Sequence, residues 1–133
     1  MGDRLNVLYI DDEPDIRTIV EMALCLDPDF ELRIAASGPE GLAIVEGGWH
    51  PDIALLDMMM PEMSGKDVLN RLRAMTEFAA LPILFVTASA RRADVELYLS
   101  AGADGVITKP FDPLSLASTV REQYVRITAS RKE

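Results

Sequence analysis

The sequence predicts an α/β domain in which five parallel strands alternate with five helices. Apolar runs of strand length recur at residues 5–10, 30–35, 53–57, 81–86 and 105–108, and a segment with apolar residues at helical spacing follows each run. Strands and helices that alternate in this way form a parallel sheet with right-handed crossovers and helices on both faces. A chain of 133 residues has room for one such domain, so we expect a single domain over 1–133 with its core at about 5–127.

The first strand is expected at 5–10, where an apolar run stops at Asp11-Asp12-Glu13. Pro14 suits the first turn of a helix, and the acids before it suit the positive helix end. This helix carries one apolar stripe at helical spacing, which comprises Ile16, Ile19, Val20 and Ala23. The only cysteine, Cys25, lies beside the stripe and is expected to be buried and reduced.

The second strand, at 30–35, alternates apolar and charged residues, which is typical of an edge strand with one face less covered. Ser37 begins a second helix that Gly47-Gly48 closes. The third strand, at 53–57, is a continuous apolar run that ends abruptly in Asp57, so this acid is expected at the carboxyl end of a buried strand.

The second half of the chain repeats the pattern. A helix from about Gly65 carries Val68, Leu69, Leu72 and Met75, and the fourth strand, at 81–86, is followed by Thr87. A helix at 91–100 leads to the fifth strand, at 105–108, which is followed by Lys109. Asp112-Pro113 begins the last helix, with Leu116, Val120 and Ile127 on one side, and the tail 130–133 is expected to be frayed.

Composition narrows the function. The 13 basic and 22 acidic residues give a net charge of −9, which disfavours direct binding to nucleic acid and suits a site that gathers divalent cations. No apolar run approaches the roughly 20 residues of a membrane span, and no secretory leader is visible, so we expect a cytoplasmic protein without a membrane contact. One cysteine excludes an internal disulfide and a metal site built on thiolates.

Four groups of polar residues come directly after a predicted strand: Asp11-Asp12, Asp57, Thr87 and Lys109. Parallel strands place their carboxyl ends along one edge, so these side chains are expected to meet there. Two unit charges about 4 Å apart repel by roughly 4 kcal/mol at an effective dielectric near 20, so clustered carboxylates need a cation or a proton. Oxygen ligands without thiolates favour Mg²⁺, and with Lys109 and Thr87 the site is suited to a phosphoryl group in transfer to Asp57.

These residues resemble the receiver domains of bacterial two-component response regulators. The resemblance runs from about Leu5 to Ile127 and rests on Asp11-Asp12, on Asp57 with Met60-Pro61 and Gly65 after it, on Thr87-Ala88, and on Lys109-Pro110-Phe111. It implies a flavodoxin-like (βα)5 three-layer sandwich with strand order 2-1-3-4-5, an order for which a chemotaxis member of this family is a known example.

The resemblance also implies a role for each site residue. Asp57 would accept a phosphoryl group from the phosphohistidine of a sensor histidine kinase or a histidine phosphotransfer protein. Asp11, Asp12, Asp57 and the backbone carbonyl of Met59 would hold Mg²⁺. Thr87, the loop that begins at Ala88, and Lys109 would bind the phosphoryl oxygens, and Pro110 would follow a cis peptide bond.

One position departs from the family pattern. Many members carry an aromatic residue in the fifth strand, where this chain has Val106, so the switch is expected to run through Thr87 and residues 88–91. Output is expected through contact with another protein, by phosphorelay onward to a histidine phosphotransfer protein, or by competition for the phosphoryl groups of a kinase. Residues on the last two helices are candidates for contact with a downstream protein or a second copy of the chain, and otherwise form a solvated face: Arg91, Arg92, Tyr98, Arg121 and Tyr124. No output domain is expected within this sequence.

Three alternative functions share features with this sequence. A flavin domain of similar fold needs a phosphate cradle after the first strand, where this chain has Asp-Asp-Glu-Pro. An aspartate-nucleophile phosphatase or phosphotransferase generally has a second Asp two residues after the nucleophile, where this chain has Met59, so we expect only self-catalysed phosphoryl uptake and hydrolysis rather than an enzyme. A receiver-like docking module without phosphorylation is the remaining alternative.

Overall fold

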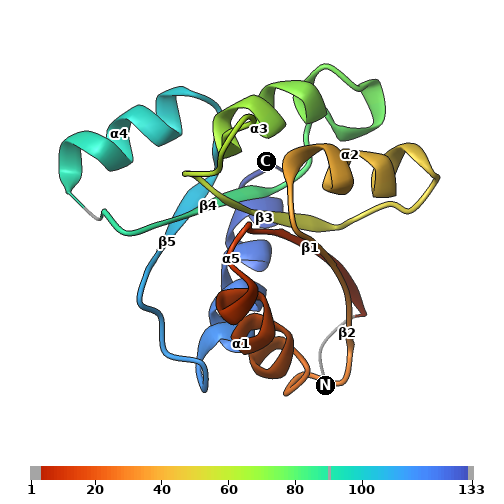
Figure 1. Cartoon of the computed structure of the whole chain (residues 1–133), viewed down its shortest axis with the longest axis vertical. Helices are drawn as coiled ribbons and strands as arrows, with labels where there is room; N and C mark the ends of the chain where they lie inside the picture. The colour runs from red at the N-terminus through yellow and green to blue at the C-terminus, as the bar shows by residue number, and fades with distance from the viewer. Residues whose placement is uncertain (1–3, 90, 132–133) are drawn as a thin grey trace.

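The computed structural model describes residues 4–89 and 91–131. Its five strands form one parallel sheet in the order β2-β1-β3-β4-β5, which confirms the predicted fold class and strand order (Figure 1). The strands are β1 (Leu5–Ile10), β2 (Phe30–Ala35), β3 (Ile53–Asp57), β4 (Ile83–Thr87) and β5 (Gly105–Thr108). The alternating strand at 30–35 lies at the edge of the sheet, as its pattern predicts.

Helices cover both faces of the sheet and make a three-layer sandwich. The helices are α1 (Pro14–Leu24), α2 (Gly38–Glu46), α3 (Gly65–Arg73), α4 (Arg92–Ser100) and α5 (Leu116–Arg131), with a short 3₁₀ helix η1 (Thr76–Phe78). Figure 1 shows α1 and α5 on one face and α2, α3 and α4 on the other. Two hydrophobic clusters, one on each face, result from this arrangement.

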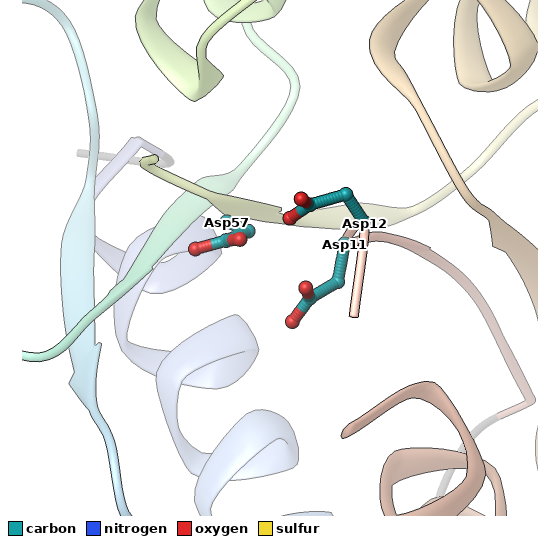
Figure 2. Close-up of side chains that lie close together, drawn as sticks. All are labelled: Asp11, Asp12 and Asp57. Carbon is teal, nitrogen blue, oxygen red and sulfur yellow. The ribbon is translucent and has the colours of Figure 1, made fainter. Parts of the chain in front are cut away.

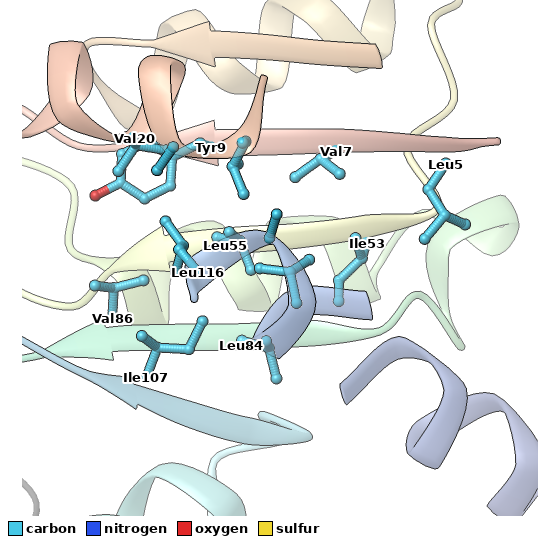
Figure 3. Packing of buried hydrophobic residues seen from close by; sticks show 14 of the residues in the cluster. Leu5, Val7, Tyr9, Val20, Ile53, Leu55, Leu84, Val86, Ile107 and Leu116 are labelled. Carbon is cyan, nitrogen blue, oxygen red and sulfur yellow. The ribbon is translucent and has the colours of Figure 1, made fainter. Parts of the chain in front are cut away.

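The central strands are buried on both faces because their side chains alternate between the two clusters. On β1, Val7 and Tyr9 point toward α1 and α5, where Figure 3 shows them with Leu55, Val86 and their neighbours. Leu8 and Ile10 belong to the opposite cluster. Burial on both faces explains why these strands read as continuous apolar runs, and it fixes the register that aligns their carboxyl ends.

Several sequence expectations need correction. Cys25 is exposed, because it follows the last residue of α1 and points about 100° away from the buried Leu24. Ile19 is also exposed, whereas Val20, Ala23 and Leu24 form the buried stripe. The fourth strand lies at 83–87 rather than 81–86, so Thr87 is its last residue and not the first after it.

The helix boundaries differ at two further places. Helix α3 ends at Arg73, and Met75 precedes η1. Helix α5 begins at Leu116 because Asp112 accepts hydrogen bonds from the backbone N–H groups of Leu114 and Ser115 and holds a separate turn there. At the other end α5 continues to Arg131, so the expected fraying at 130–131 is wrong, and 132–133 lie outside the described residues.

Candidate functional site

The carboxyl edge of the sheet collects the residues that the sequence singles out. Ile10 on β1 pairs with Leu56 on β3, so the next residues on the two strands, Asp11 and Asp57, lie side by side. Asp12 follows on the same loop, and Figure 2 shows the three carboxylates turned toward a common space. Parallel pairing of central strands therefore brings together acids that are more than forty positions apart in the sequence.

The three acids make a compact site for a cation. One carboxylate oxygen from each of Asp11, Asp12 and Asp57 lies within 4.8 Å of the other two. Asp11 and Asp57 are 0 % and 4 % exposed, while Asp12 is half-buried and open to water on one side. Hard oxygen ligands with access to water suit Mg²⁺, which keeps several waters when proteins bind it. The residues therefore fit the metal.

The Lys109 ammonium is the positive group of the site. Its Nζ lies 3.1 Å from Oδ2 of Asp11 and 3.4 Å from Oδ1 of Asp57, and 3.7 Å from Oε1 of the exposed Glu13. Burial lowers the pKa of Lys109, but its hydrogen bond to Asp11 and the charges of Asp11 and Asp57 outweigh burial, so the pKa is raised above its ordinary value. Lys109 is therefore a permanent cation, and its peptide bond to Pro110 is cis.

Without a bound cation, the surroundings of Asp57 disfavour the ionised form of its side chain. Burial raises its pKa from 3.8 to about 7, the charge of Asp11 adds to the rise, and Lys109 opposes it. The carboxylate, which is the nucleophilic form, is therefore only partly populated near neutral pH in the metal-free protein. A cation at the site would favour the ionised form.

Asp11 is held by contacts that the sequence did not reveal. The Tyr9 hydroxyl donates a hydrogen bond of 2.6 Å to Oδ2 of Asp11, and the Glu13 backbone N–H donates one of 3.0 Å to Oδ1. Tyr9 is 1 % exposed, and burial, with the hydrogen bond to Asp11, raises the pKa of its phenol, which stays protonated as a donor. A tyrosine in a strand whose other inward residues are aliphatic was the only signal available.

Thr87, at the end of β4, is buried, and its hydroxyl contacts residues of the following segment rather than the acids. Its Oγ1 lies 3.3 Å from the Tyr98 hydroxyl and accepts a hydrogen bond of 3.2 Å from the Ser89 backbone N–H. Ala88 is exposed beside the site, and Ala90, within the predicted switch loop 88–91, lies outside the described residues. Val106 pairs with Phe85 and is half-buried, so no ring occupies that place on β5.

The loop after Asp57 is held close to the site by Gly65. A Cβ at Gly65 would lie 2.6 Å from the backbone oxygen of Asp57 and 3.0 Å from Cα of Met58, so only glycine allows α3 to begin there. The Met59 side chain is 79 % exposed. Within the described part of the chain no hydrogen bond reaches the Met59 carbonyl oxygen, which leaves it available as a ligand.

An exposed apolar groove extends from the site along α1. Ile19 and Met22 line it from α1, Leu26 from the turn after α1, and Pro113 and Leu114 from the segment before α5. It encloses about 310 Å³. A second hollow shares Ile19 and Pro113 with this groove and is also lined by Lys109 and Pro110, so the groove lies close to the site.

The five residues proposed as a partner surface divide into two groups. Arg121 donates a hydrogen bond to Asp27 and covers the Phe30 ring, and Tyr98 contacts Thr87, so both have structural partners within the chain. Arg91 and Arg92 stand in solvent at the start of α4, each beside an acid of the same helix. Tyr124, the fifth residue, is half-buried against the cluster between the sheet and helices α1 and α5, so of the five only the two arginines are exposed.

Known proteins place this arrangement in context. A family model described as "Response regulator receiver domain" matches residues 7–121. The response regulator Rre1 of Synechocystis sp. is 33 % identical over 130 residues, which are 98 % of this chain and 56 % of that protein. The probable transcriptional regulatory protein TcrX of Mycobacterium tuberculosis is 39 % identical over 110 residues, or 83 % of this chain and 45 % of that protein. The chain thus spans about half the length of these curated relatives.

Solved structures share the fold. The chemotaxis response regulator CheY4 of Vibrio cholerae superimposes with a TM-score of 0.81 at 29 % identity, over 90 % of this chain and 98 % of that one. Among the described residues, no helix combines the length and the apolar character needed to cross a bilayer.

Proposed function

Since the chain belongs to the response regulator receiver domain family, we propose that it accepts a phosphoryl group on Asp57 and changes its protein contacts in response. The observation that carries the proposal is the convergence of Asp57 with two further acids, a half-buried ammonium and a strand-end hydroxyl at one sheet edge. Transfer of a phosphoryl group needs a nucleophile, charge compensation and donors for the phosphoryl oxygens, and these residues supply all three.

In the proposed reaction a carboxylate oxygen of Asp57 attacks the phosphorus of a phosphohistidine. The new P–O bond gives an aspartyl phosphate, the P–N bond breaks, and the imidazole leaves with its electron pair and takes a proton from water. Lys109, already 3.4 Å from Asp57, would pair with the phosphoryl oxygens, and Thr87 would donate its hydroxyl proton to one of them. Water later hydrolyses the acyl phosphate, so the domain catalyses only its own loading and unloading.

Mg²⁺ would be held by Asp11, Asp12, Asp57 and the carbonyl of Met59. When bound, it would compensate the negative charge of the acids and of the phosphoryl oxygens. Asp11 is the best fixed of these ligands, because Tyr9 and Glu13 each donate a hydrogen bond to it. Asp12, on the exposed side, would leave room for waters on the metal.

The phosphoryl donor would be a sensor histidine kinase or a histidine phosphotransfer protein of the cytoplasm. The apolar groove along α1 supports this choice, because it joins the hollow that contains Lys109 and would receive an apolar face of the donor beside Asp57. Met22, which is 69 % exposed, lies in the groove away from the acids. Met22→Glu is expected to slow transfer from a phosphorylated donor protein and to leave the reaction with acetyl phosphate unchanged.

The test of the function is the intact mass after incubation with acetyl phosphate, with and without Mg²⁺. We expect one phosphoryl group on the wild-type protein only when Mg²⁺ is present, and none on Asp57→Asn. Lys109→Ala and Thr87→Ala are expected to uncouple phosphorylation from the change in partner affinity. Uptake of one phosphoryl group by Asp57→Asn would overturn the assignment of the acceptor. A folded wild-type protein that binds Mg²⁺ without uptake from acetyl phosphate or a kinase would favour a docking module.

A further inference from the structure

The Thr87 hydroxyl is tied to helix α4 through Tyr98. The two hydroxyl oxygens are 3.3 Å apart, and either can be the donor. The Tyr98 ring meets Phe85 of β4 edge-on, with 5.6 Å between ring centroids and 90° between planes. A strand-end hydroxyl at the site therefore has a direct polar contact with the middle of a helix at the surface.

The capacity of the Thr87 hydroxyl is limited to one donated proton and two accepted bonds. The Ser89 N–H uses one lone pair, and the contact with Tyr98 uses the proton or the other lone pair. Within the described residues, the Thr87 hydroxyl makes no hydrogen bond to Asp57. A phosphoryl group on Asp57 would need the hydroxyl proton of Thr87, which is the proton that the contact with Tyr98 uses when Thr87 is its donor.

Helix α4 has little else to hold it against the sheet. None of its residues, Arg92–Ser100, is buried, and Leu97 and Leu99 are 66 % and 45 % exposed. Among the residues that the structure describes, its other polar anchor, Asp94, contacts Ser89 and Arg91, which belong to the segment that leads into the helix. An element with few buried apolar contacts moves at low cost in free energy, so loss of the Tyr98 contact with Thr87 would ease movement of α4.

We propose that Tyr98 is a positioning residue that competes with the phosphoryl group for the Thr87 hydroxyl and so couples Asp57 to the position of α4. The proposal rests on the proposed function, because it needs a phosphoryl group at Asp57. Many members of the family carry an aromatic residue on β5, where this chain has Val106. In the proposal, Tyr98 on α4 provides an aromatic side chain near the site instead. Phosphorylation would then free Tyr98 and release α4 from Thr87.

The competition predicts the direction of one effect. Tyr98→Phe keeps the ring on Phe85 but removes the hydroxyl that holds Thr87, so the Thr87 hydroxyl is free to turn toward Asp57. With Mg²⁺ at saturation, beryllofluoride, a tetrahedral mimic of the phosphoryl group, should bind Tyr98→Phe roughly two- to tenfold more tightly than wild type, the range of one hydrogen bond. Calorimetry measures this affinity. Tyr124→Phe, which removes a phenol hydroxyl from α5 instead, should bind as wild type does.

Amide hydrogen exchange of α4 gives the second readout. Beryllofluoride should speed exchange over 92–100 in wild type, and Tyr98→Phe should already exchange quickly without it. If wild type binds beryllofluoride and Tyr98→Phe binds it equally or more weakly, the competition is refuted while the proposed function stands. If folded wild type binds no beryllofluoride with Mg²⁺, both proposals fail. Equal exchange of α4 in the two unliganded proteins also overturns the role of Tyr98.

Discussion

Replacement of Asp57 by asparagine should stabilise the metal-free protein. The carboxylate is 4 % exposed and faces the charge of Asp11, and within residues 4–89 and 91–131 only Lys109 pairs with it directly. Asparagine has nearly the same size and no charge, so Asp57→Asn removes the electrostatic cost while it keeps the packing. Loss of the acceptor and a gain of stability are expected in the same variant.

The magnitude and its pH dependence follow from the pKa. Burial, with Asp11 adding to it, raises the pKa of Asp57 from 3.8 to about 7, so the folded protein holds this proton more tightly than the unfolded chain does. The free energy of unfolding of wild type should therefore fall as pH rises from about 4 to about 7. This rise in the pKa of Asp57 corresponds to about 4 kcal/mol in the free energy of unfolding above pH 7. We expect Asp57→Asn to raise the free energy of unfolding by about 2–4 kcal/mol above pH 7. The gain can fall below the full 4 kcal/mol because the buried amide also needs hydrogen-bond partners.

Urea unfolding of both proteins in a chelating buffer, across the range from about pH 4 to 8, measures the gap between their free energies of unfolding. It should be near zero at the acid end and largest at the alkaline end. Mg²⁺ at about a hundred times its Kd should then stabilise wild type by about 2.7 kcal/mol and Asp57→Asn by less, because the variant lacks a ligand. Equal stability of the two proteins near pH 8, or a gap that does not change with pH, would refute the claim that the fold disfavours the ionised form of Asp57.

Three other contacts make separate predictions. Tyr9→Phe removes a donor to Asp11, so calorimetry should show a roughly tenfold weaker Mg²⁺ affinity. Gly65→Ala places a Cβ 2.6 Å from the backbone oxygen of Asp57, which should cost about 2 kcal/mol in urea unfolding and slow the reaction with acetyl phosphate. Arg73→Ala removes hydrogen bonds to three backbone carbonyls and a carboxylate, so it should cost about 2–4 kcal/mol while phosphoryl uptake is unchanged. If a variant keeps the wild-type value in its assay, the role assigned here to the contact that it changes is wrong.

Much of this architecture could be predicted because central parallel strands are buried on both faces. Their apolar runs have sharp ends, so the bounds 53–57 and 105–108 agree with the structure, and the residues that follow parallel strands meet at one edge. Asp11, Asp12, Asp57 and Lys109 were brought together on that argument alone. The edge strand β2 could also be predicted, because its alternation of apolar and charged residues indicates that one face of the strand is less covered by helices.

The contacts that the sequence did not reveal depend on side-chain direction. Tyr98 reaches Thr87 only because its rotamer and the placement of α4 point it at the end of β4, and helical spacing carries no such information. Cys25 was misjudged for a similar reason, since a neighbour of an apolar stripe faces solvent when the helix ends beside it. The start of α5 depended on a turn at Asp112 whose hydrogen bonds are local and short.

Charge balance links the chemistry of the site to its stability. Three carboxylates and one ammonium leave two negative charges at the edge of the sheet, in a protein that already carries −9 overall. A phosphoryl donor is itself an anion, so the uncompensated site repels it, and part of the Asp57 population is protonated near neutral pH. A divalent cation would cancel both charges, ionise Asp57 and admit the donor. The same repulsion would therefore weaken the metal-free fold and make phosphoryl uptake depend on Mg²⁺, so removal of any one of the four residues should change both.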